Sequence, residues 1–299
     1  MRIGITGATG FIGGHLALMA QGSGHEVIAY TRRAGSFVPL STETLVQPRE
    51  APHELPETRL DALVHLAGES LMGLWTREKR ARIRTSRVDF TAALVAHLGT
   101  WQPENRPKVF VCASGAGFYG NSGDDPVDEA SSHGEGFLAE VCVGWERAAR
   151  GAETLGARVV NLRTGMVLGA DGGAFLLLKK VFGLGLGGRL GKGTQGMAWI
   201  HIDDVAGLIL KAIETETVRG PVNVCAPEVV TNAEFTKKLA AALHRSAFFH
   251  APAFALRLLL RGMAEEMLLG GQRVIPRVAT EIGYVFAHPT LDSALNALL

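Results

Sequence analysis

The chain has 299 residues, 47% of them hydrophobic and 20% charged, a composition typical of a globular protein with a large core. Thirty basic side chains stand against twenty-nine acidic ones, so the formal net charge is +1. Bulk charge therefore predicts neither a nucleic-acid partner nor a membrane partner.

Short apolar runs alternate with longer helical patterns through the first two-thirds of the chain. Because such alternation builds crossover units, it predicts a parallel sheet covered by helices on both faces. The expected strands span residues 2–6, 26–31, 62–67, 108–114 and 157–164, and the expected helices span residues 10–21, 87–98 and 136–146.

The pattern changes after about residue 171. A glycine-rich stretch at 183–196 is followed by a strand and a helix within 199–213, and roughly the last fifty residues read as mainly helical. The most apolar run, 251–271, is interrupted by arginine and glutamate side chains, so we expect an amphipathic helix there and not a membrane span.

Cysteine usage indicates the compartment. Cys112, Cys142 and Cys225 are widely separated and form no CxxC pair, which argues against a disulfide framework and against a cysteine zinc site. The sequence opens on the strand-like RIGIT, without the charged and apolar segments of a secretory signal. We therefore expect a cytoplasmic protein.

The first strand is followed by TGATGFIGG, in which Gly7, Gly10 and Gly13 have the spacing GxxGxxG before an apolar helix. Glycines in this context permit a tight turn, a close approach of the backbone to a pyrophosphate and close packing of helix on strand. Turn geometry alone is the competing interpretation, but the position at the first strand–helix turn favours a dinucleotide. The predicted phosphate cradle comprises Gly7, Thr9, Gly10, Phe11, Ile12 and Gly13.

The second strand ends in YTRRAGS, where NAD would require a carboxylate for the ribose hydroxyls. Arg32 and Arg33 stand there instead, and guanidinium groups at this site would pair with a 2′-phosphate. The two arginines could also be solvated side chains of an ordinary loop. Their placement directly after the second strand nevertheless predicts NADP as the cofactor.

Several stretches together carry a resemblance to a known family. The sequence resembles the extended short-chain dehydrogenase/reductase superfamily, and within it the NAD-dependent epimerase/dehydratase-like family that has a helical C-terminal extension of uncharacterised function. The matching stretches, in family order from end to end, are ITGATGFIG, HLAGES, WTREKRARIRTSRV, SGAGFYG, GFLAEVCVGWE, LRTGMVLGADGGA, AWIHIDDV, RGPVNVCAPE and LGGQRVIP.

The resemblance implies an α/β fold: a Rossmann-type doubly wound parallel sheet with a smaller, mainly helical C-terminal substrate lobe. Its dinucleotide-binding domain would comprise residues 1–170, with 196–226 returning to it. The substrate lobe would comprise residues 171–195 and 227–299. We expect a small-molecule substrate to bind between the domain and the lobe. A homodimer is possible on the sequence alone.

The resemblance also places further cofactor residues. The turn after the fourth strand, with Leu66, Ala67 and Gly68, is similar to the family's contact with the adenine ribose and pyrophosphate. Arg163 falls in the segment near the nicotinamide, where it could alternatively be a structural ion-pair partner, since interior arginines are normally paired.

The superfamily's usual proton relay consists of a tyrosine, a lysine four residues later and a serine or threonine. Anchored on Glu146, the tyrosine position falls on Leu138 and the lysine position on Cys142. The serine position falls on Gly115. None of the three positions carries its usual catalytic residue, which puts the superfamily's ordinary mechanism in doubt.

Four nearby side chains are candidate substitutes for this relay: Tyr119, Ser114, Cys142 and Glu69. We favour Tyr119 as the acid/base, although the family's tyrosine there is as often a wall of the pocket. Cys142 is better interpreted as a small buried apolar residue than as a nucleophile.

Two other patterns favour structure over chemistry. In GLGGRLGKGT the glycine and Ser/Thr positions of a triphosphate loop are missing, so this stretch reads as a flap over the substrate. In WIHIDDV we interpret Asp203 or Asp204 as a cap that accepts backbone N–H bonds at the start of the following helix, and we predict no metal.

Two functions remain at this point. One is an NADP(H)-binding oxidoreductase, or an enzyme like the nucleoside-diphosphate-sugar epimerases, acting on an unknown small polar substrate without the usual Tyr–Lys pair. The alternative is a non-catalytic NADP(H)-binding or redox-sensing protein. Hydride transfer needs a cofactor, a geometry and some source of protons, so the missing pair does not exclude an enzyme.

Overall fold

A parallel sheet of seven strands forms the centre of the molecule. The computed structural model describes residues 1–32, 43–48 and 50–299. The strand order is β12-β7-β5-β4-β1-β2-β3, and every pairing is parallel. This is the predicted Rossmann-type, doubly wound architecture. The strands are β1 (Arg2–Thr6), β2 (Glu26–Thr31), β3 (Glu43–Val46), β4 (Ala62–His65), β5 (Val109–Gly115), β7 (Arg158–Thr164) and β12 (Gly220–Val224).

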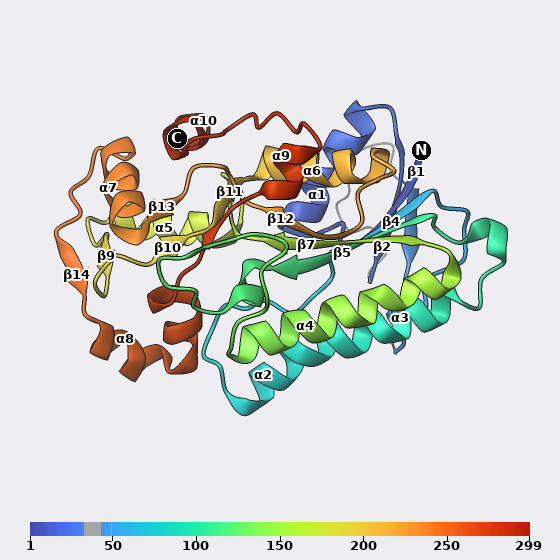
Figure 1. The fold of residues 1–299 in the computed structure, drawn as a ribbon, viewed down its shortest axis with the longest axis horizontal. Coiled ribbons are helices and arrows are strands. Elements are labelled where there is room, and N and C mark those ends of the chain that lie inside the picture. Colours follow the sequence, from blue (N-terminus) through green and yellow to red (C-terminus); the bar gives the residue numbers. More distant parts are fainter. Residues whose placement is uncertain (33–42, 49) are drawn as a thin grey trace.

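Helices cover both faces of the sheet. α1 (Phe11–Gly22) and α6 (Ile202–Glu214) lie on one face, and α3 (Phe90–Leu98) and α4 (Phe137–Arg150) lie on the other (Figure 1). Each face has its own buried core, one with Leu16 and Ile209 and one with Leu94 and Trp145. Because the inner strands are buried on both sides, their sequences are continuous apolar runs.

The five predicted strands are present, and two more were missed. β3 is a short edge strand, and β12 begins with Gly220 and Pro221, which interrupt the apolar pattern. The helix predicted at 87–98 starts earlier: α2 (Arg77–Arg84), capped by Thr76, continues through a π-helical turn (Thr85–Asp89) into α3.

A smaller lobe lies at one end of the sheet (Figure 1). Its core packs Phe175, Phe182, Trp199 and Phe235 against the last helix. Its helices are α5 (Gly173–Gly183), α7 (Asn232–Ala242) and α10 (Leu291–Leu298). Its small sheets pair β9 (Gly188–Leu190) with β14 (Phe249–Ala251), and β10 (Gly196–Met197) with β13 (Val230–Thr231).

Two further strand pairs and one helix connect the lobe to the sheet. α9 (Arg277–Glu281) packs against β12, so the C-terminal segment returns to the Rossmann domain before it ends in α10. The division of the chain into domains stays an interpretation. The strand pairs are β8 (Met166–Leu168) with β11 (Trp199–His201), and β6 (Pro126–Val127) with β15 (Arg273–Val274).

The apolar run 251–271 is not one amphipathic helix, so that prediction was wrong. α8 (Ala253–Leu260) ends at Arg261, whose φ is +53°, and a π-helical turn (Ala264–Leu269) follows. The break reverses the chain, so that the second segment reaches the cavity described below. No helix in the described part of the chain is long and apolar enough to cross a membrane.

The segment 199–213 forms a strand and a helix as predicted, but its acidic residues act differently. The N-cap of α6 is His201, whose Nδ1 accepts the N–H of Asp203 at 3.2 Å. The fully buried Asp204 accepts the N–H groups of Ala287 and His288 at 2.7 and 2.9 Å. The predicted helix cap was therefore wrong, and Asp204 holds the C-terminal segment instead.

Candidate cofactor and substrate site

The glycines of the first turn are required by close backbone contacts. Gly7 has a φ of +74°, and a Cβ on Gly13 would lie 2.2 Å from the carbonyl oxygen of Gly7. A Cβ on Gly7 would lie 3.0 Å from the backbone nitrogen of Ala67, in the turn after β4. The turn therefore has no room for side chains on its inner side, as a backbone cradle for a pyrophosphate requires.

The first turn of α1 offers free amide groups beside these glycines. The N-cap Gly10 supplies no side-chain acceptor, so the N–H groups that follow, including those of Phe11 and Ile12, have no partner within the helix. Together with the helix dipole they form an anion site. Thr9 and Gly10 are exposed next to it. These residues fit a dinucleotide.

The turns after β1 and β4 are fixed to one another by a buried histidine. His65 pairs with Thr6 Oγ1 at 2.7 Å through Nδ1 and with Thr91 Oγ1 at 3.0 Å through Nε2. Burial lowers the pKa of His65 to about 3, so the ring is neutral. Our reading of the sequence missed His65, although a histidine between apolar strand residues is a signal for a buried polar contact.

Arg87 is a second residue that the sequence reading missed. Its guanidinium lies 3.4 Å from the point that a Cβ on Gly68 would occupy, and 5.2 Å from the centre of the Trp145 ring. It lines the cavity on the side of the turn with Leu66, Ala67 and Gly68. The spacing of buried Ile83, Arg87 and buried Thr91 at i, i+4 and i+8 would have identified the inward face.

Of the two arginines predicted to select the cofactor, the structure describes Arg32. Arg32 directly follows the last strand residue, Thr31, and its side chain is exposed. Arg33 lies outside the described residues. Their role toward a 2′-phosphate stays a prediction.

A cavity of about 850 Å³ extends from the carboxyl ends of the strands into the smaller lobe. The three positions of the missing relay, Gly115, Leu138 and Cys142, all line it. Leu138 and Cys142 lie one turn apart on α4, and the Cys142 thiol donates to the carbonyl of Gly115 at 3.7 Å. The three relay positions thus face one cavity, although the tyrosine and the lysine are missing from them.

The buried pair of Glu146 and Arg163 lies beneath this wall. Arg163 donates from Nε to Oε1 at 2.9 Å and from Nη2 to Oε2 at 3.0 Å, and the Ser114 hydroxyl donates to Oε1 at 2.9 Å. The side chains of the pair are only 5% and 9% exposed, and Arg163 is not among the residues lining the cavity. This favours the structural alternative for Arg163 over a contact with the nicotinamide.

Tyr119 belongs to the same buried network. Its hydroxyl donates to Asn223 Oδ1 at 2.6 Å and accepts from Arg163 Nη1 at 3.1 Å. Burial raises its pKa to about 12, and it does not line the cavity. The acid/base role predicted for Tyr119 therefore has no support from its position.

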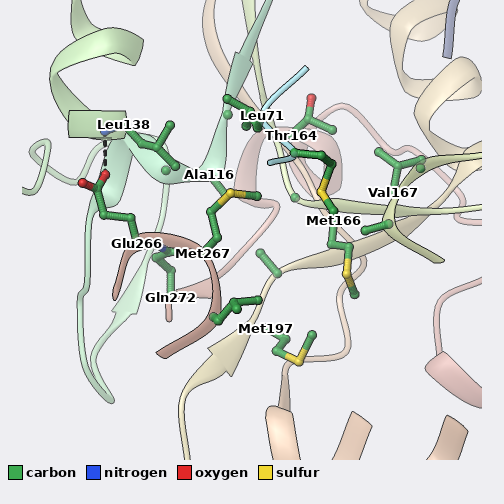
Figure 2. Close-up of a pocket in the computed structure, with 18 of the residues that line it drawn as sticks. Leu71, Ala116, Leu138, Thr164, Met166, Val167, Met197, Glu266, Met267 and Gln272 are labelled. Atoms are coloured by element: carbon green, nitrogen blue, oxygen red, sulfur yellow. Dashed lines mark hydrogen bonds between the residues drawn. The ribbon is translucent and has the colours of Figure 1, made fainter. Parts of the chain in front are cut away.

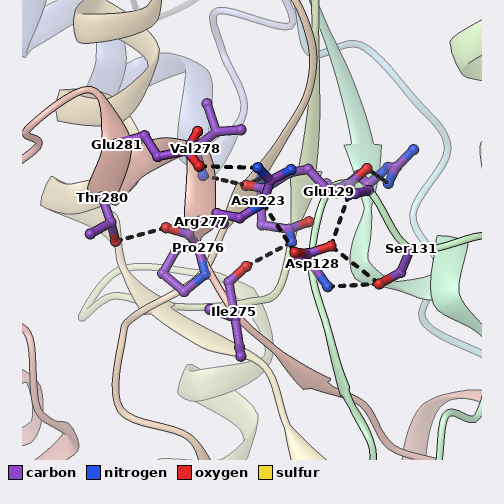
Figure 3. A network of polar contacts seen from close by, with 12 residues as sticks. Asp128, Glu129, Ser131, Asn223, Ile275, Pro276, Arg277, Val278, Thr280 and Glu281 are labelled. Carbon is purple, nitrogen blue, oxygen red and sulfur yellow. Dashed lines mark hydrogen bonds and ion pairs between the residues drawn. The ribbon is translucent and has the colours of Figure 1, made fainter.

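The network continues to the C-terminal segment (Figure 3). Glu129 Oε1 accepts the N–H groups of Asn223 at 2.9 Å and Val278 at 3.2 Å. Asn223 donates from its side chain to the carbonyl of Ile275 at 2.9 Å. Tyr119, through Asn223, is thus part of the contact that ties α9 to β12.

The other two candidates for proton transfer are also constrained. The thiol of Cys142 is 6% exposed and burial raises its pKa to about 11, so it stays protonated at neutral pH. The hydrogen bond from Lys79, at 2.7 Å, lowers the pKa of Glu69. Glu69 is therefore a carboxylate in an ion pair and does not line the cavity.

Glu266 from the C-terminal segment reaches the wall beside the missing relay. Its carboxylate accepts the N–H groups of Phe137 at 3.0 Å and Leu138 at 2.7 Å, and so caps α4 (Figure 2). The sequence reading missed this residue, because its partners lie 129 and 128 positions away. The cap fixes the first turn of α4, including Leu138, to the substrate lobe.

His201, Asp203 and His288 lie together at the start of α6, with one possible ligand atom from each within 4.8 Å of the others. Existing contacts already use them: His201 caps α6, and Asp203 Oδ1 pairs with His15 Nε2 at 2.7 Å. The absence of a metal stays a prediction.

Comparison with known proteins identifies the family. The model of the NAD dependent epimerase/dehydratase family matches residues 3–225. The chain belongs to this family. A domain of unknown function (DUF1731) matches residues 251–298, which include α8, α9 and α10.

Relatives of this family match over the whole length. An epimerase family protein of Mycobacterium bovis is 38% identical, over 98% of this chain and 96% of the relative. The crystal structure of the human epimerase family protein SDR39U1 with NADPH has a TM-score of 0.89 at 35% identity, and covers 100% of this chain and 99% of that one.

A second solved relative is a nucleoside-diphosphate sugar epimerase from Corynebacterium glutamicum, with a TM-score of 0.77 at 32% identity. The match covers 99% of this chain but 57% of that one. UDP-glucose 4-epimerases match at 18% identity, which shows the shared fold alone.

Proposed function

We propose that this protein is an NADP(H)-dependent oxidoreductase that acts on a carbonyl substrate in the cavity. The observation that carries the proposal is a glycine turn at Gly7–Gly13 that fits a dinucleotide, with a cavity at the same carboxyl edge of the sheet. The exposed Arg32 after β2 and the NADPH in the human relative's structure support NADP over NAD. When bound, the cofactor supplies or accepts a hydride.

The chain's own residues would bind and orient the reactants. The glycine turn and the first amides of α1 would hold the pyrophosphate, and Arg87 places a positive charge between the turn at Gly68 and the cavity. Ser114, Gly115 and Thr164 would form the wall at the strand ends. The Glu146–Arg163 pair supports this wall from behind through Ser114, and Glu266 holds the start of α4 beside it.

Sugar epimerisation is the less favoured activity. Such a reaction must remove and return a hydrogen at one carbon while a base takes and gives a hydroxyl proton. Among the described residues that line the cavity, neither candidate is a free base: Cys142 is protonated, and the Glu266 carboxylate already accepts two backbone N–H groups. Simple reduction makes a smaller demand, because water can protonate the product.

The test is a titration with NADPH and NADH followed by cofactor fluorescence, and then cofactor absorbance across a library of carbonyl compounds. We expect NADPH to bind more tightly than NADH and to be consumed with at least one carbonyl. Tight binding with no consumption across the library would overturn the enzyme and favour a non-catalytic NADP(H)-binding protein.

A further inference from the structure

The cavity walls are almost entirely apolar. Five of the chain's seven methionines line it, and Met166, Met197 and Met267 approach the same space from three separate segments (Figure 2). Methionine side chains are flexible and polarisable, and they adapt to apolar and aromatic ligands. Further walls come from Leu178, Phe182, Leu190, Phe235 and Phe249.

Three of the polar side chains on the lobe side of the cavity are already engaged with the protein. Gln195 donates to the carbonyls of Leu190 at 3.2 Å and Leu268 at 2.7 Å. Asn232 Oδ1 accepts the N–H of Leu190 at 2.8 Å. Gln272 donates to the carbonyl of Gly120. A sugar hydroxyl would have to compete with the protein for the donor atoms of Gln195 and Gln272 and for the acceptor oxygen of Asn232.

Charge is equally sparse. Among the described residues that line the cavity, only Arg87 and Glu266 are charged, and Arg87 lies at the end near Gly68. A nucleoside diphosphate sugar would bring a second pyrophosphate besides that of the cofactor. This group would need cations of its own in the lobe, because desolvating phosphate without a partner is costly. The lobe side of the cavity provides a carboxylate instead, which would repel it.

We propose that this cavity takes an apolar, electron-poor carbonyl compound of the quinone class and not a nucleoside diphosphate sugar. The proposal rests on the function proposed above and names its substrate class. It replaces our expectation of a small polar substrate. A cavity of about 850 Å³ lies within the range of roughly 300–1,000 Å³ that small-molecule sites occupy.

The proton donors of the wall favour a quinone over an ordinary ketone. The hydroxyls of Ser114 and Thr164 donate to Glu146 and to the carbonyl of Leu162, so neither is free to protonate a substrate. Reduction of a ketone leaves an alkoxide about as basic as hydroxide, because the pKa of an alcohol lies close to that of water. A phenolate is far less basic, because a phenol has a pKa of about 10.

The step balances with water as the only acid. The quinone gains a hydride, which is two electrons and one proton, from the reduced nicotinamide cofactor, which is thereby oxidised. The resulting phenolate takes one proton from water to give the hydroquinone. No side chain of the chain changes its protonation state.

Binding tests the proposal without turnover. Protein loaded with NADP⁺ is titrated by calorimetry with a methylated naphthoquinone, a saturated bicyclic ketone of similar size and UDP-glucose. We expect the naphthoquinone to bind at least about 100-fold more tightly than UDP-glucose, a difference of about 2.8 kcal/mol. With NADPH, we expect the quinone to be reduced at least about 100-fold faster than the saturated ketone, the lower limit of what a general acid contributes.

A matched pair of variants locates the bound quinone. Leu177 lines the cavity and is 50% exposed, so Leu177→Glu introduces a charge there at little cost in folding. It should weaken naphthoquinone binding about tenfold. Leu184 lies just beyond α5, is 75% exposed and is not among the residues lining the cavity. Leu184→Glu should therefore leave the affinity for the naphthoquinone within about twofold of the wild-type value.

The outcomes separate this inference from the function on which it rests. UDP-glucose binding as tight as that of the naphthoquinone, equal rates for quinone and saturated ketone, or equal effects of the two variants would overturn the substrate class. Failure of NADPH itself to bind would instead overturn the proposed function.

Discussion

The pair of Glu146 and Arg163 allows a direct choice between the two roles considered for Arg163. Replacing Arg163 by methionine leaves the Glu146 carboxylate buried, with the Ser114 hydroxyl as its remaining donor. Breaking a buried pair in this way costs about 3–5 kcal/mol. At about 2–4 °C per kcal/mol for a large domain, Tm should fall by roughly 6–20 °C.

The assay is urea denaturation of Arg163→Met, Glu146→Gln and the double variant. The double variant should be more stable than Arg163→Met alone, because the uncompensated charge is gone, and the coupling energy should exceed about 1 kcal/mol. NADPH binding to the folded Arg163→Met protein should change little. Unchanged stability together with a large loss of NADPH affinity would refute the structural role and make Arg163 a cofactor residue.

Three further predictions concern the cofactor end of the site. Burial lowers the pKa of His65 to about 3, so the folded protein should lose about 1.4 kcal/mol of stability per pH unit as pH falls below about 6.5. Urea denaturation measures this slope, which His65→Gln should lack. A wild-type stability that is flat between neutral and acid pH would contradict the prediction. Gly13→Ala should lower both Tm and NADPH affinity, since its Cβ would lie 2.2 Å from the carbonyl oxygen of Gly7. The control Gly14→Ala should be tolerated, because its Cβ would lie 3.5 Å from the carbonyl oxygen of Ala8. Equal effects of the two variants would refute the close packing. Arg32→Gln should weaken the binding of NADPH much more than that of NADH in fluorescence titrations. Arg219→Gln, at the amino end of β12, is the control. Equal losses of affinity for both cofactors would refute the 2′-phosphate contact.

Local pattern was enough to predict the sheet and the cradle. The inner strands are buried on both faces, so each leaves a mainly apolar run in the sequence. The cradle lies within seven consecutive residues, from Gly7 to Gly13, and its spacing carries its mechanical role. β3 and β12 escaped prediction because the first is a four-residue edge strand and the second begins with Gly220 and Pro221.

The catalytic candidates were harder to judge because their partners are distant in sequence. Tyr119 pairs with Asn223, 104 residues away, and Glu266 caps α4 from 129 residues away. Sequence proximity to the strand end made Tyr119 attractive, but the fold turns its hydroxyl into the buried network. Only the assembled structure distinguishes a side chain at the cavity from one behind its wall.

The character of the cavity was also beyond the sequence reading. Its apolar walls combine residues from α5, α7 and the segment 263–268 with residues at the strand ends. No single stretch among these has a composition that indicates a ligand. The sequence reading predicted an unknown small polar substrate, whereas the assembled walls favour an apolar one.

The most direct test of the central claim is an experimental structure of the protein with NADPH and a bound quinone. We predict that nicotinamide C4 faces the apolar cavity, that Leu138 and Cys142 are its nearest side chains, and that no carboxylate or phenol lies within about 3.2 Å of the quinone oxygens. A nicotinamide directed away from the cavity, or a hydrogen bond from Tyr119 to the quinone, would contradict it.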